Sequence, residues 1–166
     1  MHFFRRIILE LEKRQIKYLV IGGLAVNLYG YSRVTRDLDI MLSFDEENVQ
    51  KFIVMIKEVG FIPRVPVDII ELADPAKRLF WRESKNMKVF TVLNPDNDFE
   101  YIDIMIMDYL NFDEAYKQRE ILSDGDLTVS TISFDDLIKL KEISGRDRDL
   151  YDIKILKQIM EKEIGK

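Results

Sequence analysis

Hydrophobic residues recur along this chain with two spacings, one typical of amphipathic helices and the other typical of β-strands. In the helical segment over residues 46–59, Val49, Phe52 and Ile56 share one face, and Gly60 marks its end. Short apolar runs between turn residues predict strands. The pattern predicts helices over residues 3–14, 24–29, 46–59, 133–143 and 147–163, and strands over residues 17–21, 38–42, 88–93 and 99–107.

This order of elements predicts a mixed α/β (α+β) fold, with a small mixed β-sheet flanked by helices and a short C-terminal helical pair. A turn over residues 94–98 joins the last two predicted strands in a β-hairpin. The sequence contains no internal repeat, low-complexity segment or linker. We therefore expect residues 1–166 to form one domain, with an α/β core over about 1–130 and C-terminal helices over about 131–166.

The composition narrows the classes of protein that fit the chain. No cysteine is present, which excludes disulfides, a thiolate nucleophile and a zinc–sulfur site. The N-terminal segment reads as an amphipathic helix rather than a secretory signal, and no apolar run approaches the roughly 18 residues of a membrane span. We therefore expect a cytoplasmic protein that does not bind membranes. The net charge of −5 argues against a broad surface for nucleic acids, which normally carries a basic excess.

Two aspartates stand out in the predicted strand that ends at Leu42. Strand side chains alternate between faces, so Asp37 and Asp39 point the same way. Two ionised carboxylates side by side repel each other, which raises the pKa of at least one of them. A divalent cation between them removes that repulsion, and oxygen ligands suit Mg²⁺. The pair therefore indicates a metal site more readily than a polar strand edge.

A glycine pair, Gly22 and Gly23, separates a predicted strand from a predicted helix. Backbone amides at such a junction can approach an anion closely, and a helix N-terminus adds partial positive charge. Glycine pairs are common at turns, so this pair alone is a weak indication of phosphate binding. Its proximity in sequence to Asp37 and Asp39 makes the indication stronger.

One segment joins these features through Gly22, Gly23, Arg33, Thr35, Asp37 and Asp39. It resembles the signature of the nucleotidyltransferase superfamily. The chain is most similar to minimal nucleotidyltransferases related to the toxins of abortive-infection type toxin–antitoxin systems. That family places a third carboxylate on a later strand, where this chain has Asp103, and basic residues in a late helical segment, where it has Lys141 and Arg146. The resemblance extends over residues 18–156.

The resemblance implies the nucleotidyltransferase fold and a chemistry. A nucleoside monophosphate would move from a nucleoside triphosphate (NTP) to an acceptor hydroxyl, with Mg²⁺ or Mn²⁺ as cofactor and release of pyrophosphate. The implied catalytic and metal-binding residues are Asp37, Asp39 and Asp103. The implied nucleotide-binding residues are Gly22, Gly23, Arg33, Thr35, Lys141 and Arg146.

Some of these assignments have rivals in the sequence. Glu100, Asp98 and Asp108 lie near Asp103, but Glu100 is offset by an odd number and should face the other side of the strand. Asp98 and Asp108 fall at the strand ends, where acids are common. The late basic residues have a second interpretation as exposed ion pairs with Asp149 and Asp152, which would stabilise the fold little.

The acceptor is open among RNA or tRNA, a protein and a small molecule, as are an antitoxin partner and the oligomeric state. Two other functions compete with nucleotidyl transfer. One is a catalytically silent protein that binds a nucleotide or a partner, as an antitoxin does; the intact set of three aspartates argues against it. The other is a metal-dependent nuclease, which would leave the glycine pair without a role.

Overall fold

The computed structural model describes residues 2–164. The strands are β1 Tyr18–Val20, β2 Leu38–Leu42, β3 Ile62–Pro63, β4 Val89–Asn94, β5 Asn97–Met105, β6 Glu120–Asp124 and β7 Leu127–Thr131. The helices are α1 His2–Lys13, α2 Gly22–Leu28, α3 Glu46–Glu58, the 3₁₀ helix η1 Ile69–Ala73, α4 Pro75–Lys85, α5 Phe112–Lys117, α6 Phe134–Ser144 and α7 Asp147–Ile164.

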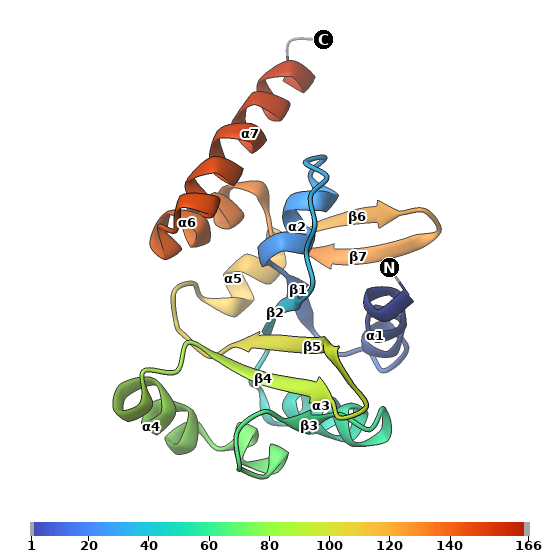
Figure 1. Ribbon diagram of the computed structural model, residues 1–166, viewed down its shortest axis with the longest axis vertical. Helices are drawn as coiled ribbons and strands as arrows, with labels where there is room; N and C mark the ends of the chain where they lie inside the picture. The colour runs from blue at the N-terminus through green and yellow to red at the C-terminus, as the bar shows by residue number, and fades with distance from the viewer. Residues whose placement is uncertain (1, 165–166) are drawn as a thin grey trace.

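The strands form one seven-stranded mixed sheet in the order β3-β4-β5-β2-β1-β7-β6, flanked by helices (Figure 1). The pairs β2–β5 and β1–β7 are parallel, and the remaining pairs are antiparallel. The late helices α6 and α7 form the predicted C-terminal pair, and α7 extends away from the sheet (Figure 1). The fold class predicted from the sequence is confirmed.

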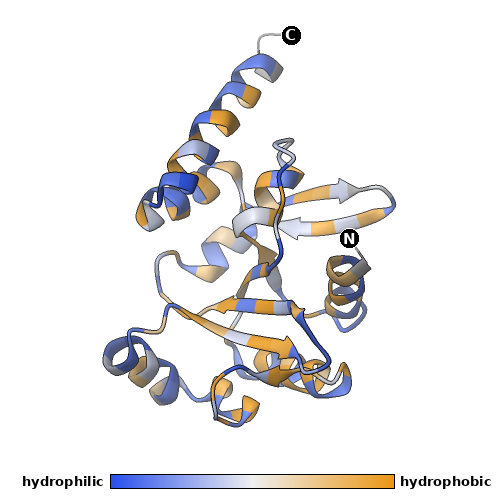
Figure 2. Cartoon of the chain, in the orientation of Figure 1, coloured by the Kyte–Doolittle hydropathy of each residue, from blue (hydrophilic) through white to orange (hydrophobic). Residues whose placement is uncertain are grey.

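The pairing of β2 with β5 sets the centre of the molecule. Leu38 and Ile40 on β2 lie opposite Ile102 and Ile104 on β5, and all four are fully buried. Hydrophobic and hydrophilic residues alternate along β5 (Figure 2). Because strand side chains alternate, the residues between these apolar positions face the other side of the sheet. The hydrophobic effect therefore fixes both the register of this pair and the face to which its acidic residues point.

The hairpin of β6 and β7 was not predicted from the sequence, because β6 is mostly exposed. β6 is an edge strand, and residues 120–123 on it are exposed or only half-buried, so the strand lacks the alternating apolar signal. The short helix α5 was missed as well. The helix α2 begins at Gly22, two residues before its predicted start. None of the helices within residues 2–164 is long and apolar enough to cross a bilayer.

Candidate active site

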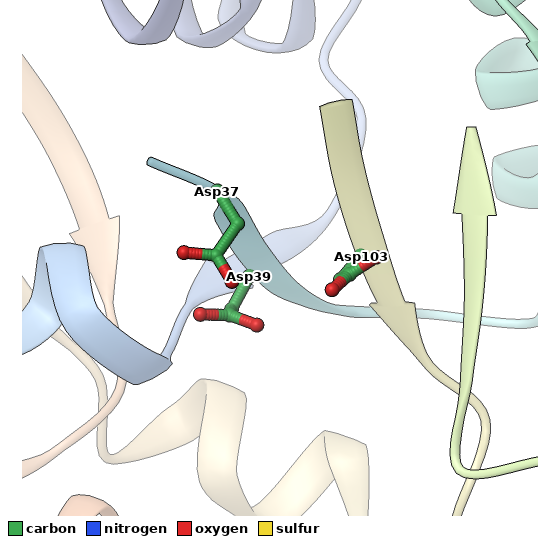
Figure 3. A group of neighbouring side chains, drawn as sticks. All are labelled: Asp37, Asp39 and Asp103. Carbon is green, nitrogen blue, oxygen red and sulfur yellow. The ribbon is translucent and has the colours of Figure 1, made fainter. Parts of the chain in front are cut away.

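Three aspartates meet on one face of the sheet (Figure 3). Asp39 on β2 is the register partner of Asp103 on β5, and Asp37 lies one residue before β2. Each residue contributes one carboxylate oxygen to the cluster, and these three oxygens all lie within 4.8 Å of one another. The structure thus brings together three acids that are up to 66 positions apart in the sequence, at 37, 39 and 103.

The electrostatics of this cluster make it unfavourable without a cation. Burial is the main cause that raises the pKa of Asp39 to about 7, and the charges of Asp37 and Asp103 raise it further. A backbone hydrogen bond from Gly23 acts in the opposite direction. Burial also raises the pKa of Asp103, although the Thr91 hydroxyl donates to its Oδ1 at 2.5 Å. These donors orient the acids but do not neutralise them.

The glycine pair has a packing role that the sequence did not reveal. A Cβ atom on Gly22, which has φ +61°, would lie 2.0 Å from Asp39 Oδ2. A Cβ atom on Gly23 would lie 2.3 Å from Thr35 Oγ1. Thr35 in turn donates to Asp37 Oδ1 at 3.2 Å. The absence of side chains at the start of α2 therefore lets the acidic cluster approach the helix closely.

A network of buried charges connects the C-terminal helices to the site. Asp152 is fully buried, and its Oδ2 accepts hydrogen bonds from Arg33 Nη2 at 2.8 Å and Lys141 Nζ at 2.7 Å. Lys141, also buried, donates to Asp149 Oδ1 at 3.0 Å. Arg146 Nε donates to Asp149 Oδ2 at 2.7 Å. The interpretation of Asp149 and Asp152 as partners in exposed ion pairs is therefore wrong, because both carboxylates are buried.

The same network holds the loop that leads into β2. The Asn27 side chain forms hydrogen bonds with the backbone N–H and carbonyl of Arg33, at 3.0 and 2.8 Å. Arg148 on α7 donates to the Val34 carbonyl at 2.6 Å. Together with the Arg33–Asp152 ion pair, these contacts fix the segment that carries Thr35 and leads to the aspartates. The helix α7 thus positions one side of the site.

Hydrogen bonds decide the ionisation of Asp149. Burial pushes the pKa of Asp149 upward, but hydrogen bonds from Arg146, Ser144 and Lys141 outweigh it and hold the pKa at about 2. Asp149 is therefore ionised at neutral pH. Its negative charge offsets part of the positive charge of the cations around it.

A cavity of about 790 Å³ opens beside the aspartates. All the residues that the sequence analysis proposed for the site line it, and their roles stay predictions. Arg146 has a largely exposed side chain. Its hydrogen bond to Asp149 is the main cause that raises the pKa of its guanidinium, and the nearby charges of Asp39 and Asp37 raise it further. The cavity lining also includes residues that the sequence analysis did not assign to the site, namely Tyr101, Met105, Tyr109, Val89 and Arg148.

Two of the rivals of Asp103, Glu100 and Asp108, have other partners. Glu100 accepts hydrogen bonds from Arg6 and Asn94. Asp108 forms an ion pair with Arg82. Within residues 2–164, the acids that come together as a possible metal site are Asp37, Asp39 and Asp103. Three carboxylates that share one small space fit a divalent cation that accepts oxygen ligands.

Comparison with known proteins finds solved structures of similar fold. No family model matches the sequence, and neither does any curated protein. The lincosamide antibiotic adenylyltransferase LnuA, bound to lincomycin, is similar over 95% of this chain and 96% of its own, with a TM-score of 0.62 and 21% identity. ANT(2″)-Ia in complex with adenylyl-2″-tobramycin is similar over 92% and 84%, with a TM-score of 0.60 and 13% identity.

A third similar structure is a candidate nucleotidyltransferase from Thermotoga maritima. It matches 97% of this chain and 92% of its own, with a TM-score of 0.57 and 14% identity. All three likenesses extend over nearly the whole of this chain. The chain therefore has the fold that nucleotidyltransferases share, as the sequence resemblance implied.

The close approach of Gly22 to Asp39 can be tested by substitution. We expect Gly22→Ala to lower the free energy of unfolding by more than the roughly 1–2 kcal/mol that positive φ costs an alanine, because the new methyl group displaces the Asp39 carboxylate. Gly60→Ala is the matched control, since Gly60 has φ +80° and a Cβ atom added to it would meet nothing within 4 Å. Urea unfolding measures both, and equal losses would contradict the packing role.

Because the pKa of Asp39 is raised, we predict that ionising it lowers the free energy of unfolding, by an amount that depends on pH. Folded Asp39 keeps its proton up to about pH 7, whereas the unfolded chain loses it near pH 3.8, so stability falls as pH rises between these values. Asn has no carboxyl group to ionise, so the Asp39→Asn variant does not lose stability in this way. Both proteins are measured in EDTA, so that no divalent cation is bound. We expect the variant's stability advantage over the native chain to grow by about 2–3 kcal/mol between pH 5 and pH 8. Urea unfolding at both pH values measures it, and a constant difference would contradict the shift.

The buried network predicts a large effect at Asp152. Asp152→Asn leaves Arg33 and Lys141 without one carboxylate partner, so we expect a loss of about 3 kcal/mol in the free energy of unfolding. Asp126→Asn is the control, because the Asp126–Arg5 ion pair is exposed and should change stability by less than about 1 kcal/mol. Similar losses in the two variants, measured by urea unfolding, would show that the buried carboxylate stabilises the fold no more than an exposed one.

Proposed function

We propose that this protein is a metal-dependent nucleotidyltransferase that moves a nucleoside monophosphate from an NTP to an acceptor hydroxyl. The observation that carries the proposal is the meeting of Asp37, Asp39 and Asp103 within 4.8 Å, on a fold that nucleotidyltransferases share. A divalent cation held by these carboxylates would neutralise charge on the phosphate oxygens. The raised pKa of Asp39 supports this assignment, because a cation would relieve the repulsion that contributes to it.

The proposed reaction exchanges one bond to phosphorus for another. The acceptor oxygen bonds to the α-phosphorus, the bond from that phosphorus to the oxygen bridging to the β-phosphate breaks, and pyrophosphate leaves. Asp103 would take the hydroxyl proton. Burial raises the pKa of Asp103, which makes it a stronger base than an exposed aspartate. The Thr91 hydroxyl holds Oδ1 of Asp103 and so orients the carboxylate.

The basic residues of the cavity fit the negative charge of a triphosphate. We assign direct phosphate contact to Arg146, because its side chain is 77% exposed and its charge acts on Asp37 and Asp39. Arg33 also lines the cavity, but its guanidinium pairs with the buried Asp152. Lys141 also lines it, but its ammonium is bonded to Asp149 and Asp152. Lys141 would therefore act mainly by holding these two carboxylates in place.

The comparisons favour a small-molecule acceptor over RNA, a protein or an antitoxin-linked target. LnuA acts on a lincosamide antibiotic, and ANT(2″)-Ia is described with adenylylated tobramycin. The cavity of about 790 Å³ is large enough for part of a nucleotide and a small acceptor. We therefore propose a hydroxyl-bearing small molecule as the acceptor. A role as a toxin draws its support from the sequence resemblance alone.

The test is transfer from each α-³²P-labelled NTP with Mg²⁺, in separate incubations with a small-molecule extract, total RNA and total protein. We expect label in a small molecule and release of pyrophosphate. Asp39→Ala should lower the rate at least about 100-fold, since the carboxylate acts on the reacting charge. Asp98→Ala is the matched control, because Asp98 is an exposed acid on the same strand as Asp103.

The outcomes separate the competing functions. Label in RNA or protein would keep nucleotidyl transfer and reject the small-molecule acceptor. Cleaved RNA without incorporated label would indicate a nuclease. Binding of an NTP with no transfer in any incubation would indicate a catalytically silent protein.

A further inference from the structure

The cavity has two unlike sides around the aspartates. One side is formed by the glycine pair, the loop before β2 and the cations of α6 and α7. The other is the face of β4 and β5, which we call the β4–β5 floor and define by Val89, Tyr101 and Met105 together with Lys88 and Tyr109 at its edge. The first side has the charge that a triphosphate needs. The floor adjoins Asp103 and is free for a second molecule.

Strand register makes the floor apolar and aromatic. Val89 pairs with Met105, and Thr91 pairs with Asp103, so these side chains share one face of the sheet. Their neighbours Phe90 and Ile104 are fully buried on the opposite face. A molecule whose hydroxyl reaches Asp103 would therefore rest its body on Val89, Met105 and the ring of Tyr101.

Two basic side chains lie beside the floor. Lys88 lines the cavity and is exposed. The guanidinium of Arg64 lies 4.7 Å from the centre of the Tyr101 ring, and its charge acts on Asp103 as well. Lys88 and Arg64 thus lie beside the floor, and the charges of Asp37, Asp103 and Asp39 also reach Tyr101. The charge around the floor is positive only when a cation neutralises the three aspartates.

The acids around the floor have cationic partners of their own. Glu100 pairs with Arg6, and Asp108 pairs with Arg82. On the opposite wall, the Asp149 carboxylate is bonded to Lys141 and Arg146. Among the residues that line the cavity, the remaining acids are the three aspartates already assigned to the cation. With a cation held by the three aspartates, an acceptor with several ammonium groups would find repulsion here and no free carboxylate to pair with.

We propose that the β4–β5 floor is the acceptor site and that it selects a small molecule with an aromatic or apolar body and an acidic group. This inference rests on the proposed nucleotidyl transfer. The body stacks on Tyr101 and packs on Val89 and Met105, while the acidic group pairs with Lys88 or Arg64. A polyamine such as tobramycin is excluded as the acceptor, which separates this chain from ANT(2″)-Ia, described with that molecule.

Three probes of matched shape test the charge preference: 4-(hydroxymethyl)benzoate, 4-(hydroxymethyl)benzamide and 4-(hydroxymethyl)benzylamine. Binding is followed with Mg²⁺ present, so that the aspartates hold a cation, by NMR of the ¹³C-labelled methyl group of Met105, assigned with Met105→Leu. We expect the benzoate to bind at least about tenfold more tightly than the benzylamine, with the amide between them. The preference should weaken as NaCl is added, because the cations are exposed.

Substitutions link the preference to the two cations. The double variant Lys88→Glu and Arg64→Glu should abolish or invert the preference, and it should fold normally because both residues are exposed. Lys85→Glu is the matched control, because Lys85 is exposed and does not line the cavity. An inversion in the double variant with no change in the control would support the proposal.

Several results would overturn the assignment. These are tighter binding of the benzylamine or of tobramycin, equal binding of the three probes, failure of all three to shift Met105, or displacement of the benzoate by a short RNA that binds more tightly. The readout is independent of catalysis. A protein that shows the preference but transfers no label from any NTP would refute the proposed function and leave the floor as an anion-selective site.

Discussion

Repulsion among three aspartates held in a small, largely buried space is the constraint on which the rest of this structure depends. The parallel pairing of β2 with β5 places Asp39 beside Asp103, and the buried apolar residues on the opposite face keep that register. Hydrophobic burial therefore holds like charges together against their repulsion. Such an arrangement is stable because the surrounding structure over-determines it, and a bound cation would remove the repulsion.

The structure places backbone and cations around this cluster rather than neutralising it. Glycines at the start of α2 allow close approach of the acids, and Gly23 donates to Asp39. The basic side chains of Arg33, Lys141 and Arg146 surround this cluster, and they donate hydrogen bonds to the buried carboxylates of Asp152 and Asp149. The C-terminal helices thus complete the site instead of merely covering the sheet. This division leaves the aspartates available to a cation and leaves the exposed part of Arg146 available to phosphate.

The two sides of the cavity follow from the secondary structure that forms them. Helix termini and a loop supply the polar side, where long basic side chains converge. The sheet face of β4 and β5 supplies a flat side on which alternate residues present aromatic and apolar surface. A nucleotide and an acceptor need these two environments, the first for its charge and the second for shape and stacking. The proposed division of labour between the sides rests on this difference.

The sequence by itself determined the fold class and the motif that joins Gly22 and Gly23 to Asp37 and Asp39, since these depend on local periodicity and on short spacings. The candidate third acid, Asp103, came from the family resemblance. Tertiary structure alone decided that Asp103 lies opposite Asp39, that Asp149 and Asp152 are buried, and that β7 and β6 extend the sheet beyond β1. Periodicity reports which side of an element is buried, but it does not report which element lies against it. Long-range pairing and the burial of charge arise only when the chain has folded, which is why the sequence suggested ion pairs at Asp149 and Asp152 but not their burial.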